Sequence, residues 1–89
     1  MKSSTTDEFW DLLRVLPLDL RKQAQHAYEQ FTRDPFHPGL NFEEVDKRRN
    51  LWSAHVTRDY RVLGIRDGDE ITWFWIATHR EYEKLIKSR

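Results

Sequence analysis

The sequence predicts an α+β fold in which a helical hairpin covers an antiparallel sheet and a short helix follows it. The stretch from Leu51 to Ala77 reads as three consecutive strands. Its Asp67-Gly68 pair, between apolar runs, is typical of a tight hairpin turn because Gly accepts a positive φ. The last run, 71–77, is apolar on both parities, which indicates a central strand covered on both faces. Apolar residues before the sheet recur instead at helical spacing.

Two helices are predicted ahead of the sheet. Thr5 and Glu8 match a capping box, so the first helix should begin at Thr5 or Thr6, and we expect residues 1–5 to be disordered. Pro17 ends this helix and can open a second one that runs to about Arg33. The expected inner positions of the two helices are Phe9, Leu12, Leu13, Leu16, Leu20, Ala24, Ala27 and Phe31.

The remaining segments border the sheet. Prolines in 34–39 rule out a helix there, and Leu40–Val45 reads as a short strand whose mixed parity predicts a bulge or an early end. The polar segment 46–50 should be a connection. Residues 79–86 should form a short helix with Tyr82 on its inner side.

Composition limits the class of protein. The 89 residues are enough for a single domain, 1–89. The chain has no cysteine, and its 15 basic and 15 acidic residues cancel. Without disulfides, a long apolar segment or a secretory leader, a cytoplasmic protein with no membrane partner is expected. The four histidines show no ligand spacing, so neither a metal nor another cofactor is expected.

Several motifs in this order resemble the RelE/ParE superfamily of toxins from bacterial type II toxin–antitoxin systems, most closely the RelE/YoeB-like members. The resemblance covers nearly the whole chain. Its most specific parts are His37-Pro38-Gly39-Leu40 before a strand, Asp59-Tyr60-Arg61 at the head of a hairpin, and the block from Trp73 to Tyr82.

The resemblance implies a twisted antiparallel sheet of about four strands, with the helical hairpin on one face and the active site on the other. It also implies a toxin that a cognate antitoxin neutralises. RelE-like and YoeB-like members cut messenger RNA at the ribosomal A site and so inhibit translation, whereas ParE-like members poison DNA gyrase. A metal-independent endoribonuclease, a hydrolase that binds RNA and the ribosome, is therefore the first expectation.

The resemblance also suggests roles for individual residues. Arg61 matches the family's strand arginine, and its planar fork suits a phosphate. His79 matches a residue active in proton transfer or phosphate contact, His55 and Ser53 stand where other members carry basic residues, and Glu43 falls near a carboxylate proposed as base. The predicted catalytic residues are thus Arg61, His79, Glu43 and His55, and the predicted RNA- or phosphate-binding residues are Lys47, Arg48, Arg49, Arg58, Arg80 and Tyr82.

Two further functions stay open. A neutral chain departs from the basic character that ribosomal RNA favours, so the chain can also be a non-catalytic inhibitor of gyrase or a degenerate, non-toxic member. Structural roles also remain open: Arg61 can pair with Asp59 or Glu70, His55 can be an ordinary exposed strand residue, and Tyr82 can be a core aromatic.

The register of the sheet decides which residues share a face. A three-residue connection, 57–59, pairs His55 with Arg61 and Ser53 with Leu63, and it is favoured because a two-residue turn buries the guanidinium. Pairing Arg66 with Asp69 then puts Arg61 opposite Phe74, Val62 opposite Trp73 and Tyr60 opposite Trp75. The prediction is therefore that His55, Arg61 and Phe74 share one face, while Ala54, Val56, Val62, Trp73 and Trp75 face the helices.

Overall fold

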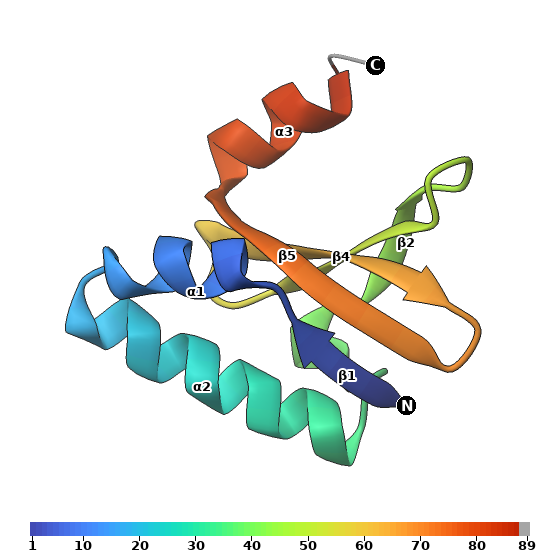
Figure 1. The fold of residues 1–89 in the computed structure, drawn as a ribbon. Helices are drawn as coiled ribbons and strands as arrows, with labels where there is room; N and C mark the ends of the chain where they lie inside the picture. The colour runs from blue at the N-terminus through green and yellow to red at the C-terminus, as the bar shows by residue number, and fades with distance from the viewer. Residues whose placement is uncertain (88–89) are drawn as a thin grey trace.

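The computed structural model describes residues 1–87 as a five-stranded sheet with a helical hairpin on one face (Figure 1). In chain order the elements are β1 (Lys2–Thr5), α1 (Asp7–Arg14), α2 (Leu18–Arg33), a 3-10 turn η1 (Pro38–Leu40), β2 (Glu43–Asp46), β3 (Leu51–His55), β4 (Tyr60–Asp67), β5 (Glu70–Thr78) and α3 (His79–Lys87). The strand order is β1-β5-β4-β3-β2, with β1 parallel to β5 and the other pairs antiparallel. The predicted α+β class is confirmed, although the sheet has one more strand than expected.

The helical hairpin forms where the apolar spacing predicts it. The Phe9 N–H donates to Oγ1 of Thr6 at 3.2 Å, so Thr6 rather than Thr5 caps α1. Val15 closes α1, and Pro17 occupies the N-cap of α2, where its fixed φ suits a helix start. The helix α2 ends at Arg33, as predicted.

The expectation of disorder at residues 1–5 is wrong, because this segment forms the edge strand β1. Ser3 lies opposite Ile71 in a parallel pair, and the Thr6 N–H donates to the carbonyl of Trp73 at 3.0 Å. The edge of β5 offers a row of backbone donors and acceptors that an extended segment can satisfy. Such pairing depends on the backbone, so polar composition gave no signal of it.

The segment after the prolines is shorter as a strand than predicted. Pro38–Leu40 forms the turn η1, and β2 begins only at Glu43. Its pairing with β3 shifts between Glu44 and Asp46, which confirms the predicted bulge.

The β3–β4 register agrees with the prediction. His55 pairs with Arg61 and Ser53 with Leu63, across the connection at residues 56–59. Because cross-strand partners point to the same face, this register places Arg61 beside His55 and away from Ala54 and Val62.

The predicted β4–β5 register is wrong. Asp67 pairs with Glu70, so Arg61 lies opposite Ala77, Val62 opposite Ile76 and Tyr60 opposite Thr78. Gly64 pairs with Trp73 and Leu63 with Trp75, which leaves Phe74 without a partner. This bulge reverses the side-chain alternation along β5. Trp73 therefore faces the helices as expected, whereas Trp75 points to the opposite face and is 37% exposed.

Gly64 makes this arrangement possible. A Cβ at this position would lie 2.8 Å from the Trp73 ring, 2.9 Å from Ile71 Cγ1 and 3.0 Å from the Thr72 carbonyl oxygen. The indole of Trp73 thus occupies the space that any larger residue in β4 would need.

The core lies between the helices and the sheet. Phe31 is 3% exposed and meets the rings of Phe42 and Trp73 edge-on, at centroid distances of 5.1 and 5.4 Å. The buried members of this cluster are Phe9, Phe31, Leu40, Phe42, Ala54, Val62, Ile71, Trp73 and Ile76. Leu51, Ser53, Leu63 and Ala77 are also buried but lie outside this cluster, on the other face of the sheet.

Candidate functional site

The candidate site is a polar corner where β3 ends, β4 begins and β5 runs into α3. His55 is the last residue of β3, and its partner Arg61 is the second residue of β4. His79 opens α3 directly after β5, and its backbone N–H donates to the carbonyl of Asp59 at 2.6 Å. Three elements that are separate in sequence thus bring one guanidinium and two imidazoles to one corner.

Arg61 is held by the start of α3. Its Nε and Nη2 lie 3.2 and 3.0 Å from Nδ1 of His79, and its guanidinium lies over the ring of Tyr82, 5.0 Å from the centroid. The rings of His79 and Tyr82 are stacked at 6.3 Å with an interplanar angle of 23°. Tyr82 is half-buried and outside the core cluster. Within residues 1–87, the polar partner of the Arg61 side chain is His79, and no ion pair joins Arg61 to Asp59 or Glu70.

A reciprocal cap fixes the start of α3. Oε1 of Glu81 accepts from the backbone N–H and the hydroxyl of Thr78, both at 3.0 Å, and the Glu81 N–H donates to the Thr78 hydroxyl at 3.1 Å. This is a capping box, and the Thr-x-x-Glu spacing that signals it is present in the sequence. The cap defines the first turn of α3 and with it the direction in which His79 and Tyr82 project.

His55 has a second set of neighbours on and before β2. Nδ2 of Asn41 lies 3.3 Å from its Nε2. Burial and the positive charge of Arg61 lower the pKa of His55 from its usual 6.5, His79 lowers it further, and Glu43 raises it. His55 is therefore neutral at pH 7 and able to accept a proton.

Glu43 lies on the same face of the sheet as His55. It pairs with Ser53, two residues before His55 in β3, and its side chain is exposed. Of the four predicted catalytic residues, Arg61 and His79 are in direct contact, and both act electrostatically on His55. Glu43 is an electrostatic neighbour of His55.

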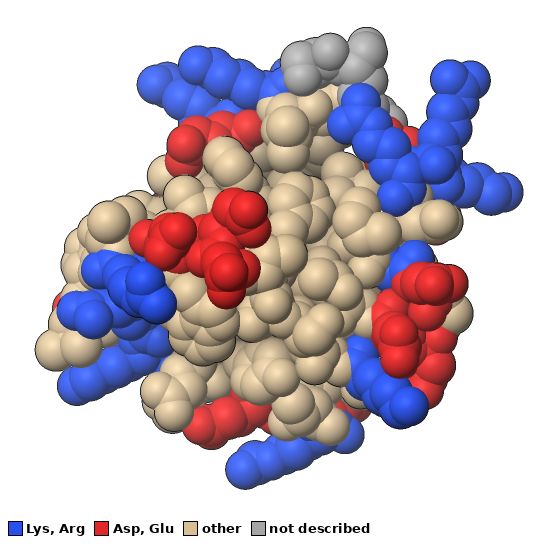
Figure 2. All heavy atoms as spheres, in the orientation of Figure 1, with Lys and Arg blue, Asp and Glu red and all other residues tan. Residues whose placement is uncertain are grey.

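The predicted phosphate-binding residues fall into two groups. Arg58 lies in the β3–β4 connection and Arg80 follows His79, so both border the corner. Lys47, Arg48 and Arg49 lie in the β2–β3 loop at the other end of β3, about 13 Å away by strand rise. Figure 2 shows Lys and Arg side chains beside α3 at the top and beside this loop at upper right, with a broad uncharged surface below them in the middle of the view.

The loop that carries these cations is held by Asp46. This carboxylate is 6% exposed, accepts from the Arg48 N–H at 3.0 Å and lies 3.3 Å from Nε of Arg49. Arg66, from β4, lies over the ring of Trp52 at 4.6 Å nearby, and its backbone N–H donates to the Asn50 carbonyl. The β2–β3 loop is thus an ordered basic surface separate from the corner.

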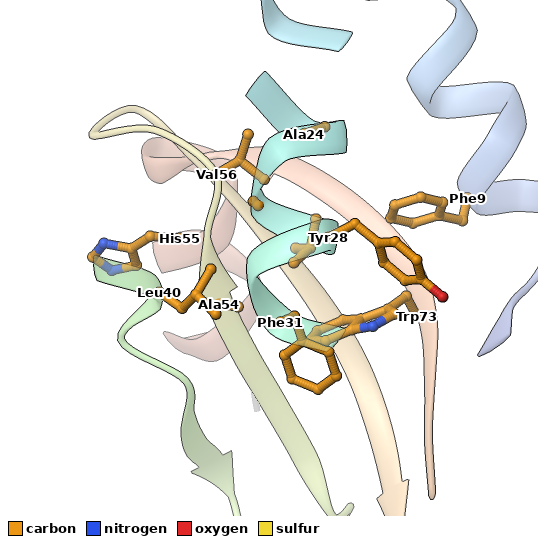
Figure 3. Close-up of a pocket in the computed structure, with 11 residues that line it drawn as sticks. Phe9, Ala24, Tyr28, Phe31, Leu40, Ala54, His55, Val56 and Trp73 are labelled. Atoms are coloured by element: carbon orange, nitrogen blue, oxygen red, sulfur yellow. The ribbon is translucent and has the colours of Figure 1, made fainter. Parts of the chain in front are cut away.

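An apolar cavity with His55 in its lining lies behind this corner. It holds about 40 Å³ between α2 and the sheet, and Figure 3 shows Phe31, Tyr28 and Trp73 around it while the ring of His55 points away. An open groove of about 370 Å³ also reaches His55 from the side of α2, with Gln23, Gln30, His26 and His37 in its lining. His55 therefore stands between this groove and Arg61.

Two findings concern metal sites and membrane spans. No cluster of three or more metal-binding side chains occurs within residues 1–87. In the same part of the chain, no helix has the length and apolar character needed to cross a membrane.

Two residues of this corner were not predicted from the sequence. Asn41 has a left-handed backbone, φ 45°, which Asn tolerates better than most residues and which turns its side chain toward His55. Glu83 lies 2.8 Å from Nε2 of His79, and their spacing of four residues in a helix is a signal that the sequence does contain. The long-range contact of Asn41 has no comparable signature.

Chemically, the corner suits a phosphodiester. Arg61 offers charged N–H donors in a fixed plane, while two imidazoles flank it for proton transfer near neutral pH. Tyr82 adds an aromatic face on which a base can stack. No other described part of the sheet combines these groups.

Comparison with known proteins identifies a family and several solved structures with the same fold. The profile of the ParE-like toxin domain family matches residues 18–84. A YoeB/ParE toxin from Agrobacterium tumefaciens superposes with a TM-score of 0.67 at 18% identity, covering 89% of this chain and 99% of that one. The RelB–RelE antitoxin–toxin complex from Methanococcus jannaschii gives 0.72 at 14% identity, covering 92% and 96%. The YoeB dimer from Staphylococcus aureus gives 0.68 at 10% identity, covering 89% and 97%. No curated protein matches the chain.

Proposed function

The chain belongs to the ParE-like toxin domain family, and from that premise we propose that it is the toxin of a type II toxin–antitoxin system that cleaves messenger RNA on the ribosome. The observation that carries the proposal is the contact of Arg61 with His79 beside a neutral His55. This arrangement supplies a cation and two proton-transfer groups without a metal ion.

The proposed reaction is attack by a ribose 2′-OH on the adjacent phosphorus. The 2′-oxygen to phosphorus bond forms, the bond from phosphorus to the 5′-oxygen breaks, and the products are a 2′,3′-cyclic phosphate and a 5′-hydroxyl. Arg61 stabilises the charge that develops on the phosphorane oxygens. One side chain takes the 2′-OH proton and another gives a proton to the 5′-oxygen.

His55 is the better candidate for the proton acceptor. Burial and Arg61 lower its pKa, so it is in the neutral, accepting form at pH 7. Glu43 lies on the same face and raises the pKa of His55, so in this proposal it tunes the base instead of replacing it. His79, on the other side of Arg61, then gives the proton to the leaving oxygen.

The basic residues outside the corner have a binding role in this proposal. Arg58 and Arg80 border the reacting phosphate, and the β2–β3 loop with Lys47, Arg48 and Arg49 contacts phosphates further along the RNA or the ribosome. Binding through such contacts weakens as salt rises, by roughly 0.7 in log K per log salt for each phosphate of single-stranded RNA. A net charge of zero means that these local clusters carry the attraction.

The proposed partner is a cognate antitoxin, and the proposed compartment is the cytoplasm, where ribosomes and messages are found. One structurally similar toxin, RelE from Methanococcus jannaschii, was solved with its RelB antitoxin. Trp75, in β5 on the same face of the sheet as Arg61, is 37% exposed and offers apolar area for an antitoxin segment beside the site.

Induced expression of this chain alone in bacteria tests the proposal. Growth should arrest soon after induction, and primer extension on translated messages should show new cuts within A-site codons. The Arg61→Ala variant, expressed to an equal soluble level, is the matched control because it should be folded but inactive. Unimpaired growth at full soluble expression would refute the toxin assignment.

Inhibition of DNA gyrase by binding is the second candidate. Two observations favour it, the neutral net charge of the chain and its match to a ParE-like family. Growth arrest without cuts in messages, but with reduced supercoiling by purified gyrase, would select this function. Arg61→Ala would then leave the arrest intact.

A further inference from the structure

Glu83 has a place in the corner that none of the predicted roles includes. Its Oε1 lies 2.8 Å from Nε2 of His79, one helical turn earlier, and both side chains are about half exposed. The other ring nitrogen, Nδ1, receives Nε and Nη2 of Arg61. Both nitrogens of His79 are therefore engaged, each by a different kind of partner.

These two partners determine where the His79 proton lies. A guanidinium has only donors, so Nδ1 must present its lone pair to Arg61. A neutral imidazole then carries its single proton on Nε2, where the carboxylate of Glu83 accepts it. The arrangement is consistent with one tautomer only, and adding a proton to Nδ1 requires Arg61 to move away.

We propose that Glu83 is a positioning residue that holds the Nε2 proton of His79, so that His79 exchanges protons with its substrate through Nδ1 alone. This inference rests on the proposed RNA cleavage. In the free protein Arg61 covers Nδ1, and the scissile phosphate draws the guanidinium away from it. Nδ1 then takes a proton from solvent and gives it to the 5′-oxygen as the bond from phosphorus to that oxygen breaks.

Tyr82 supports the same geometry. Its ring stacks on His79 and lies under the guanidinium of Arg61, so it restricts the imidazole plane while leaving both ring nitrogens at the edge. With the plane fixed by Tyr82 and one nitrogen held by Glu83, Nδ1 is the atom directed at Arg61 and its phosphate.

A different result is expected if the contact between Glu83 and His79 only stabilises α3. A pair with His at i and Glu at i+4 contributes only a few tenths of a kcal/mol to a helix. In that case the loss of Glu83 changes stability slightly and leaves both the tautomer and cleavage unchanged.

The test compares Glu83→Ala with Glu83→Gln, which retains an oxygen acceptor, by two measurements. Long-range ¹H–¹⁵N correlation spectra report which nitrogen of His79 carries the proton, with the other histidines as internal references. Cleavage of translated message gives the rate. Glu29→Ala is the control, because Glu29 is a helical carboxylate with a neighbour at i−4, Gln25, on the solvent side of α2.

The wild-type protein should show the Nε2–H form. With Arg61 in place the guanidinium alone keeps Nδ1 unprotonated, so the spectra are compared in an Arg61→Ala background, where Glu83→Ala should give a mixture of tautomers. With Arg61 present, Glu83→Ala should cleave roughly tenfold more slowly, the scale found for carboxylates that orient metal-ligating histidines. Glu83→Gln should bring both readouts back toward those of the protein with Glu83, because its amide oxygen can still accept the Nε2 proton. Glu29→Ala should change neither.

An Nδ1–H tautomer in the wild type, or a Glu83→Ala variant that matches Glu29→Ala in both readouts, would overturn the inference. Absence of cleavage by the wild type would instead refute the proposed RNA cleavage, and the spectra alone would then decide whether Glu83 sets the tautomer.

Discussion

Different interactions dominate on the two faces of this sheet, although successive residues of the same strands supply the side chains of both faces. On the helix side, Phe31 and Trp73 meet edge-on, and apolar burial dominates. On the other side, Arg61 is held by two contacts to a ring nitrogen and by the face of Tyr82. Neighbours in β4, Arg61 and Val62, belong to opposite faces.

Residues on the helix side therefore stabilise the fold, whereas residues on the other face are available for the proposed chemistry. Truncation of a residue on the helix side removes apolar contacts, so the fold loses free energy of unfolding. A half-exposed residue in the corner contributes little to stability, so it can serve binding and proton transfer. Substitutions on the two faces should therefore affect different measurements.

Phe31→Ala should have the largest effect on stability. Its ring contacts Phe42 and Trp73 in the core, so truncation should lower the free energy of unfolding by about 3–5 kcal/mol. Phe36, which is 59% exposed, is the matched control, and Phe36→Ala should cost about 1 kcal/mol or less. Chemical denaturation measures both values. Equal losses in the two variants would contradict the helix-side core.

Gly64→Ala should have an intermediate effect. The added Cβ would lie within 3.0 Å of the Trp73 ring and the Thr72 carbonyl, and the paired backbone at that site cannot move freely. Overpacking of this kind costs about 1–3 kcal/mol. Ile65→Ala, at the next and 40% exposed position, is the control, with a smaller expected loss. A Gly64→Ala variant as stable as wild type would refute the placement of Trp73 over β4.

The titration of His55 should have a smaller effect on the free energy of unfolding than the substitutions in the core. Burial and then Arg61 lower its folded pKa below 6.5, so as pH falls through this range the unfolded chain binds the proton first. The contribution of His55 therefore destabilises the fold as pH falls below about 6.5 and is absent above it.

Two variants separate the causes of this shift. Removing a positive neighbour with Arg61→Ala should raise the pKa of His55, and removing a negative one with Glu43→Gln should lower it further. NMR titration of the His55 ring protons measures both. Shifts in the same direction would show that these residues are not its electrostatic neighbours.

Local signals in the sequence predicted most of the fold. Helical spacing located α1 and α2, and the cost of burying Arg61 selected the correct β3–β4 register. The β4–β5 register differs from the prediction for two reasons. The turn consists of Gly68 and Asp69, so that Asp67 pairs with Glu70, and a bulge at Phe74 then shifts the pairing by one more residue beyond Gly64 and Trp73. The contact of Trp73 with Gly64 exists only once the strands pair.

The site and β1 also show the difference between local contacts, which the sequence signals, and long-range contacts, which it does not. Contacts within one helix or its cap, such as His79 with Glu83 or Thr78 with Glu81, have a spacing that is visible in the sequence. Asn41 meets His55 across the fold, and β1 joins β5 through backbone hydrogen bonds, so neither leaves a side-chain pattern. Predictions therefore failed where long-range backbone geometry decides the outcome.

Primer extension on translated messages, with wild type and Arg61→Ala expressed to equal soluble levels, is the sharpest test of the proposed cleavage site. Loss of Arg61 removes a half-exposed cation and should change the unfolding free energy by only about 1 kcal/mol. It should abolish the A-site cuts, because in the proposed reaction Arg61 is the permanent charge beside the two imidazoles that transfer protons. Cuts that persist unchanged in the folded variant would contradict this site and move the active centre elsewhere.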